Sequence, residues 1–206
     1  MYIFLDYDGT LNLTDERTYA KTYYGALFDY TGLDPEMYLD AINFSVEKII
    51  KENDTSKNNF EKFLTHMEKY TNKDRKEWKE KFLDFYQNGF DAVKKAVKPN
   101  EELINTLKNS NHNLIFASNP LFPKICVEKR IEMIDMKPED FVYISHMENS
   151  NTTKPHKEYF ENILKELKIT PEEAIIIGDT DFDKAAEKVG IKFIHVEEVD
   201  KWKELI

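Results

Sequence analysis

Short apolar runs that end in polar residues recur along this chain of 206 residues. Ile3–Leu5 runs directly into Asp6, and three further runs, at 114–117, 141–144 and 174–177, end in or lead into polar groups. Continuous apolar runs of this length, separated by helical stretches, are typical of strands buried on both faces of a parallel sheet. Ligands bind at the carboxyl ends of the strands in such sheets. We therefore expect the polar residues after these runs to share one site.

The long interval between the first and second runs has the pattern of four helices. Four hydrophobic stripes show the spacing of one helix face, and breaks are expected at 32–35, 53–59 and 71–74. Such helices bury their stripes only against each other or against the sheet, so a small helical bundle is predicted. The stripes are Tyr19, Tyr23, Leu27 and Tyr30; Leu39, Ile42, Val46 and Ile49; Phe60, Phe63, Leu64 and Met67; and Trp78, Phe82 and Phe85.

Two carboxylates stand at the end of the first run. Asp6 and Asp8 are two residues apart, so their side chains project from the same side of an extended chain. Like charges this close repel each other unless a cation lies between them. Mg²⁺ suits such a site because it prefers oxygen ligands and keeps several waters. The plain alternative is an Asp-Gly turn that closes a strand.

The remaining polar groups complete an ordered set of four motifs. In chain order they are Asp6-Tyr7-Asp8-Gly9-Thr10, Ser118-Asn119, Lys154-Pro155 and Gly178-Asp179-Thr180-Asp181-Phe182-Asp183. This set resembles the haloacid dehalogenase superfamily, and it covers residues 1–12 and about 97–196. The segment between carries no mark of a subfamily. The interval from Asp183 to Gly190 is one residue shorter than the fourth motif leads us to expect, which leaves the role of Asp183 in more doubt than that of Asp179.

The resemblance implies an α/β fold: a Rossmann-like parallel sheet with an inserted all-helical cap, as in members similar to phosphoglycolate phosphatase and β-phosphoglucomutase. The core would comprise residues 1–14 and 92–206, and the cap residues 15–91. Hinges are expected near 12–16 and 89–99. Tyr19, Tyr23 and Tyr24 follow the first hinge, and they either line a substrate pocket or belong to the core of the bundle.

The resemblance also implies a Mg²⁺-dependent phosphatase that acts through an aspartyl phosphate. Asp6 would be the nucleophile, and Asp8 the acid that protonates the leaving oxygen and later the base that activates water. Mg²⁺ would be held by Asp6, by the main-chain carbonyl of Asp8, and by Asp179. Asp183 would act through water or by orienting its neighbours.

Three further residues would bind the phosphoryl group of the substrate. By the same resemblance, Ser118 donates a hydrogen bond to a phosphoryl oxygen and Asn119 helps to position the site. Lys154 neutralises charge on the phosphoryl group and on Asp6. The plain alternative for Lys154 is a surface lysine at the start of a helix. His146 and Glu148, in the loop before Lys154, are weaker candidates for contact with the substrate.

Other activities are compatible with parts of this pattern. A dehalogenase would use Asp6 but has no need of an acid at Asp8. A phosphomutase of the same superfamily shares all four motifs and differs only in whether a sugar hydroxyl or water accepts the phosphoryl group. A receiver-like module or a non-catalytic phosphate-binding module is a further alternative, but a receiver domain has no insert of this length.

The composition narrows the class of partner. The net charge of −10 disfavours a nucleic-acid surface, and no apolar stretch approaches the length of a membrane span. We therefore expect a small-molecule phosphate ester as the partner and leave the oligomeric state open. The single Cys126 suits a reducing compartment. With Asp6 so close to the first residue, no signal peptide is expected, so a cytoplasmic location is predicted.

Overall fold

The computed structural model describes residues 1–52 and 54–206. Its centre is a sheet of five parallel strands in the order β3-β2-β1-β4-β5. The strands are β1 (Tyr2–Leu5), β2 (Asn113–Phe116), β3 (Phe141–Ile144), β4 (Ala174–Gly178) and β5 (Lys192–His195). The four apolar runs of the sequence are thus confirmed as strands to within one residue. The fifth strand was not predicted.

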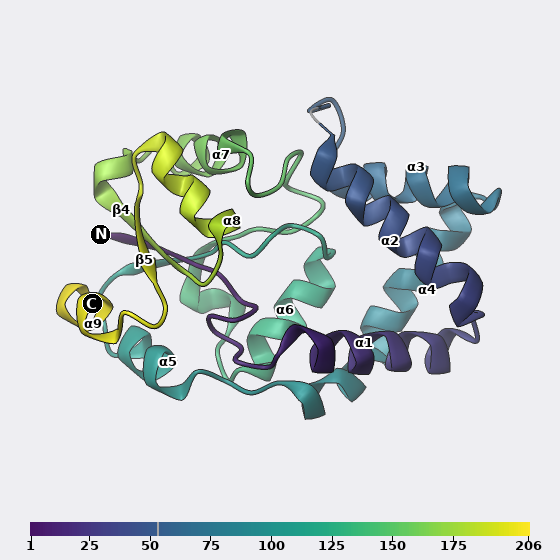
Figure 1. The fold of residues 1–206 in the computed structure, drawn as a ribbon, viewed down its shortest axis with the longest axis horizontal. Coiled ribbons are helices and arrows are strands. Elements are labelled where there is room, and N and C mark those ends of the chain that lie inside the picture. Colours follow the sequence, from purple (N-terminus) through teal and green to yellow (C-terminus); the bar gives the residue numbers. More distant parts are fainter. Residues whose placement is uncertain (53) are drawn as a thin grey trace.

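Helices cover both faces of the sheet (Figure 1). On one face, Ile3, Leu5 and their neighbours pack against α5 (Glu101–Lys108), α6 (Lys124–Met133) and α9 (Val199–Leu205). On the other, Phe4 packs against α7 (Lys157–Leu167) and the short segment η4 (Ala185–Val189), which follows α8 (Asp181–Lys184). Because the residues of β1 alternate between two cores, this central strand is buried on both sides. Single turns of 3₁₀ helix, η2 (Pro138–Asp140) and η3 (Pro171–Glu173), precede β3 and β4.

The insert between β1 and β2 contains the four predicted helices. They are α1 (Glu16–Thr31), α2 (Pro35–Lys51), α3 (Asn59–Thr71) and α4 (Arg75–Asn88), followed by the 3₁₀ helix η1 (Phe90–Ala96). Side chains of Asp15, Asp34, Asn58 and Asp74 cap their first turns. The predicted breaks are confirmed, although Asn53, at the start of one of them, lies outside the described residues.

The buried faces of these helices differ from the predicted stripes at two places. Tyr30 is 42% exposed, and its hydroxyl donates to Asp84 on the surface. On α2, Tyr38 is buried where Leu39 was expected. Tyr38 stacks edge-on against Trp78 of α4, so the neighbouring helix determines which side of the first turn is covered.

The helical insert forms a cap on one side of the sheet, and both chain ends lie on the far side (Figure 1). Its two connections to the core run next to each other. The Leu13 amide donates to the Lys98 carbonyl at 2.7 Å, and the buried Asn12 carboxamide oxygen accepts from the amides of Thr14 and Lys98. The predicted hinges therefore meet at the base of the cap. The domain boundaries at 14/15 and 91/92 stay predictions.

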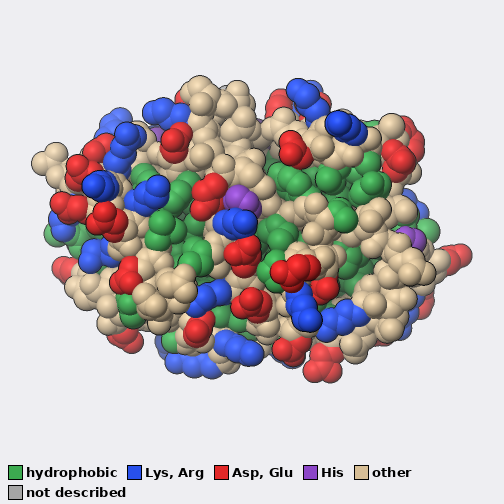
Figure 2. All heavy atoms as spheres, turned by 180° about the vertical axis from the view of Figure 1, so that it is seen from behind, with side chains coloured by type: hydrophobic (Ala, Val, Ile, Leu, Met, Phe, Trp, Pro, Cys, Tyr) green, Lys and Arg blue, Asp and Glu red, His purple; other side chains and the backbone are tan. Residues whose placement is uncertain are grey.

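The surface is charged and mixed. On the face shown in Figure 2, acidic and basic side chains intermingle, with hydrophobic atoms visible between them. Among the described residues, no helix is long and apolar enough to cross a membrane.

Candidate active site

The carboxyl ends of the three central strands carry the first, second and fourth motifs. Asp6 directly follows β1, and its amide donates to Ile177 of β4 at 3.1 Å. Ser118 lies two residues beyond the end of β2, and Asp179 directly follows β4. Since β1 lies between β2 and β4, these side chains converge on one edge of the sheet.

Lys154 supplies a buried cation at this edge. It lies in the loop after β3, and its ammonium donates to Asp6 Oδ1 at 2.7 Å and to Asp183 Oδ1 at 2.5 Å. All three side chains are at least nine-tenths buried. The alternative of a surface lysine is therefore wrong.

Asp183 is held from both sides. While Oδ1 accepts from Lys154, Oδ2 accepts from the amides of Asp179 and Thr180 and from the Thr180 hydroxyl. The backbone of Gly178 passes directly over this carboxylate, since a Cβ on Gly178 would lie 2.4 Å from Asp183 Cγ. Despite the shortened interval to Gly190, Asp183 thus belongs to the cluster around Lys154.

The cluster contains more negative than positive charge. Oxygen atoms of Asp6, Asp179 and Asp183 lie within 4.8 Å of one another, with one ammonium among them. Burial raises the pKa of Asp6 to about 7; the charges of Asp183 and Asp8 act in the same direction, and Lys154 opposes them. Burial and the charge of Asp183 also raise the pKa of Asp179. The pKa of Lys154 is raised as well, because Asp6 and Asp183 outweigh the effect of burial.

These residues fit a divalent cation. Three carboxylates and one ammonium leave two negative charges, and hard oxygen donors are what Mg²⁺ prefers. Asp179 is half-exposed, whereas both oxygens of Asp183 already accept hydrogen bonds. Asp6 and Asp179 are thus the carboxylates with free oxygen atoms for a metal, whereas Asp183 accepts from Lys154 and from the backbone amide of Asp179. The main-chain carbonyl of Asp8 stays a predicted ligand.

A glycine makes room for Asp179. Gly9 has φ +75°, and a Cβ there would lie 2.0 Å from Asp179 Oδ2. The first motif therefore needs glycine at this position both for the left-handed turn and for the approach of the fourth motif.

The Asp8 carboxylate is bonded to Arg130, a residue that was not predicted from the sequence. Its Oδ2 accepts from Arg130 Nη2 at 2.5 Å. Arg130 is buried on α6, with its guanidinium over the rings of Tyr7 and Phe122, 4.0 and 4.7 Å from their centroids. The burial of Arg130 could have been predicted, because Cys126, Val127, Arg130 and Ile131 have the spacing of one buried helix face.

The second motif lies beside the cluster. Ser118 is buried at the edge of the cavity described below, and its carbonyl accepts from the Tyr159 hydroxyl at 3.2 Å. The Asn119 carboxamide oxygen accepts from the Lys154 amide at 3.2 Å. Asn119 therefore positions the backbone of Lys154, and both residues lie where the sequence predicted.

A cavity of about 720 Å³ joins the cluster to the cap. Asp6, Asp8, Ser118, Lys154 and Asp179 line its core end. The cap end includes Tyr19, Tyr23 and Tyr24, of which the first two are also buried in the bundle core. Tyr19 and Tyr23 are therefore confirmed as part of the bundle core, and contact of the three tyrosines with a substrate stays a prediction.

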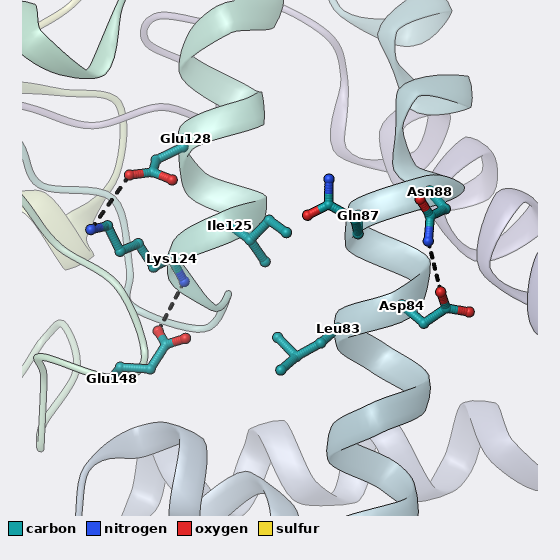
Figure 3. A pocket seen from close by; sticks show the side chains of 8 residues that line it. All are labelled: Leu83, Asp84, Gln87, Asn88, Lys124, Ile125, Glu128 and Glu148. Atoms are coloured by element: carbon teal, nitrogen blue, oxygen red, sulfur yellow. Dashed lines mark hydrogen bonds and ion pairs between the residues drawn. The ribbon is translucent and has the colours of Figure 1, made fainter.

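A second hollow of about 710 Å³ lies between α4 and α6 (Figure 3). Of the described residues that line it, none belongs to the four motifs. Glu148 lies here and accepts from the Lys124 amide and from His146. The cavity that joins the carboxylate cluster to the cap includes Met147 in its described lining but neither His146 nor Glu148. These two candidates therefore lie outside the cavity that contains Asp6.

Comparison with known proteins agrees with this architecture. The profile of the family described as haloacid dehalogenase-like hydrolase matches residues 2–196. The chain therefore belongs to this family of hydrolases. No curated protein matches its sequence.

Solved structures share the fold at low sequence identity. A 2-haloacid dehalogenase from Pseudomonas syringae is 17% identical with a TM-score of 0.59, over 94% of this chain and 85% of that one. A superfamily enzyme from Bacteroides thetaiotaomicron, in complex with magnesium and inorganic phosphate, is 18% identical with a TM-score of 0.55, over 94% and 92%. The putative hydrolase YfnB from Bacillus subtilis, bound to magnesium, is 16% identical with a TM-score of 0.60, over 93% and 86%.

Proposed function

We propose that this chain is a magnesium-dependent phosphatase that hydrolyses a small phosphate ester through an aspartyl phosphate on Asp6. The observation that carries the proposal is the environment of Asp6. It accepts from buried Lys154, lies within the carboxylate cluster, and opens on the same cavity as Asp8. A dehalogenase has no use for a second carboxylate at the position of Asp8.

Each side chain then has a defined task. Asp6 attacks phosphorus, and the alcohol oxygen leaves with the bonding pair and takes a proton from Asp8. Asp8 then removes a proton from the water that attacks the acyl phosphate, which returns Asp6 as a carboxylate. Lys154 and the Ser118 hydroxyl bind the phosphoryl oxygens. Asp6 and Asp179 would hold Mg²⁺, which would supply charge stabilisation for the phosphoryl group.

The cap, residues 15–91, is proposed to act as a lid over Asp6. Its connections leave the core beside Asp6, and it closes one side of the cavity. The magnesium-bound YfnB structure is described as revealing interdomain movement. A similar movement here would admit the substrate and then exclude water. A cytoplasmic location and a small-molecule partner remain part of this proposal.

The decisive experiment measures phosphate release by the purified protein with Mg²⁺ from a panel of phosphate esters, with chloride release from 2-chloropropionate measured in parallel. Asp6→Asn should abolish phosphate release, because an amide keeps the shape but loses the nucleophile. Asp8→Asn should lower kcat by about 10²–10⁴-fold. Acid quenching and mass spectrometry should locate the phosphoryl group on Asp6.

Three results would contradict the proposal. One is retention of about a tenth or more of turnover by Asp6→Asn, since loss of a covalent nucleophile costs far more. Another is release of chloride without release of phosphate. The third is transfer of the phosphoryl group to a sugar hydroxyl in preference to water, which would identify a phosphomutase.

A further inference from the structure

The cavity above Asp6 is large compared with a phosphoryl group. Its volume of about 720 Å³ falls in the range of pockets that enclose a drug-sized ligand, roughly 300–1,000 Å³. The phosphoryl group occupies only the end near Asp6 and Lys154. The remaining space, under the cap, is where the alcohol part of the ester would lie.

All four cap helices present apolar or aromatic side chains to this space. Ala20 comes from α1, Val46 and Ile50 from α2, Phe63 from α3 and Phe82 from α4. Leu13 and Phe182 also line the cavity and are each 43% exposed, so they add apolar surface where it opens to solvent.

Of the four tyrosine hydroxyls in the described lining of the cap wall, three are already paired, and that of Tyr19 is buried without a partner. The hydroxyls of Tyr23 and Tyr86 bond each other at 2.7 Å, and the Tyr24 hydroxyl donates to Asn43 at 3.2 Å. A sugar carries several hydroxyls, so most of its hydrogen bonds to water would be lost here, with the Tyr19 hydroxyl as the one tyrosine partner left free in the described lining.

The charges of the lining exclude a second anionic group. Among the described residues that line the cavity, Lys154 is the only cation, and it is already paired with Asp6 and Asp183. The charged side chains in the described lining at the cap end of the cavity are Asp15 and Glu16. A carboxylate or a second phosphate on the substrate would therefore meet repulsion and no counter-charge.

From these observations we infer that the substrate is the phosphate monoester of a bulky apolar alcohol, with one phosphate and no other charged group. This inference rests on the proposed phosphatase function and specifies its substrate class. Sugar phosphates, bisphosphates and phosphoglycolate fall outside this class.

The test compares primary-alcohol phosphates, whose leaving groups have similar chemistry and differ mainly in what must fill the cavity. Phenylbutyl phosphate, glycerol phosphate and glucose 6-phosphate are assayed with Mg²⁺. We expect kcat/KM for phenylbutyl phosphate to exceed both others by about tenfold or more, since even one methylene in an apolar pocket is worth roughly tenfold. Equal or faster hydrolysis of glucose 6-phosphate would overturn the inference.

A binding measurement separates this inference from the proposed function. Dissociation constants of the same esters are measured by calorimetry on Asp6→Asn, which cannot turn them over. Tighter binding of phenylbutyl phosphate supports the inference, and equal or tighter binding of glucose 6-phosphate refutes it. Failure of the wild type to release phosphate from any ester refutes the proposed function instead.

A variant of the cap tests whether the apolar part of the substrate lies under it. Ala20→Trp fills the cavity from α1, so it should lower the ratio of kcat/KM for phenylbutyl phosphate to that for ethyl phosphate by about tenfold. Ala92→Trp, at an exposed alanine outside the cavity lining, should leave this ratio unchanged. Ala20→Leu provides the same test if the tryptophan variant does not fold. An unchanged ratio in a folded Ala20 variant would overturn the inference.

Discussion

Asp8 is held by Arg130, a buried arginine whose guanidinium is covered by aromatic rings. Arg130 is 1% exposed, whereas 54% of the Asp8 side chain faces solvent. Stacking over Tyr7 leaves the edge of the guanidinium free to donate in the plane of the carboxylate. The pair thus defines where the Asp8 carboxylate lies relative to the cavity.

Replacing Arg130 should slow the chemical step more than it weakens substrate binding. In Arg130→Met, Asp8 keeps its contact with water but loses its fixed direction. We expect kcat to fall by on the order of 10²-fold with KM changed little, because a small misplacement of a reacting group has this effect. Arg130→Lys, which retains the charge without the planar fork, should recover part of the loss. Steady-state kinetics check both variants.

The exposed Arg75 supplies the control, since Arg75→Met should leave kcat unchanged. A rise in KM at constant kcat in Arg130→Met would show that Arg130 serves substrate binding or folding and does not position Asp8. Melting temperatures of the variants identify a loss of the fold.

Gly9 offers a sharper test of the geometry. Gly9→Ala would strain a left-handed turn and push a methyl group against Asp179, so Mg²⁺ affinity and turnover should both fall strongly. Gly25, on the exposed face of α1, has open space around it. Gly25→Ala should therefore stabilise the protein by about 0.5–1 kcal/mol. Calorimetric titration measures the Mg²⁺ affinity of Gly9→Ala, and thermal unfolding measures the stability of Gly25→Ala. Full Mg²⁺ affinity in Gly9→Ala would refute the close packing of Gly9 against Asp179.

At the scale of elements, the first turn of α3 fastens the cap to the core. Asn59 is fully buried, and its backbone N–H donates to the Ser150 carbonyl. Its side-chain Nδ2 donates to the carbonyls of Thr152 and Pro120. Lys62 adds a bond from its ammonium to the Asn151 carbonyl at 2.8 Å. Three of these four acceptors lie in the loop that leads to Lys154, so the cap is bonded to the same loop as this lysine.

Asn59→Ala should loosen this attachment. It removes the side-chain donor from two carbonyls, and each buried group left without a partner costs about 1–3 kcal/mol. We expect faster amide hydrogen exchange in α3 and in residues 145–153, together with a higher KM. Asn105→Ala, at an exposed position of α5, is the matched control. Unchanged exchange in α3 would show that other contacts hold the cap.

For the whole molecule, we expect the excess negative charge at one edge of the sheet to make stability depend on Mg²⁺. EDTA should abolish activity and lower the melting temperature, and Mg²⁺ should restore both. At a hundredfold excess over its dissociation constant, a ligand that binds only the folded state stabilises it by about 2.7 kcal/mol. Ca²⁺ should fail to restore activity, because it takes longer and more numerous bonds than Mg²⁺.

The two acidic residues of the fourth motif should differ in this assay. Asp179→Ala removes a carboxylate with free oxygen atoms and should weaken Mg²⁺ binding most. Asp183→Ala removes a partner of Lys154 and two backbone amides, so it should mainly lower stability. Equal losses of Mg²⁺ affinity in the two variants would make Asp183 a direct ligand.

Much of this architecture follows from local patterns in the sequence. The strands at 114–117 and 174–177, the four cap helices and the convergence of Asp6, Ser118, Lys154 and Asp179 all depend on periodicity and on the rule that parallel strands place their carboxyl ends together. β5 escaped prediction because Lys192–His195 is only partly apolar and pairs along one side with β4. The alternation of its burial is visible only once its neighbour is present.

What the tertiary structure alone decided are the contacts between distant residues. Arg130 meets Asp8 across 122 positions of sequence, and Asn59 meets Thr152 across 93. Such pairs depend on how α6 and the loop after β3 pack on the sheet, which no local period encodes. The apolar lining of the cavity has the same origin: a hydrophobic stripe predicts that a helix face is covered, and only the packing of the cap determines whether protein or substrate covers it.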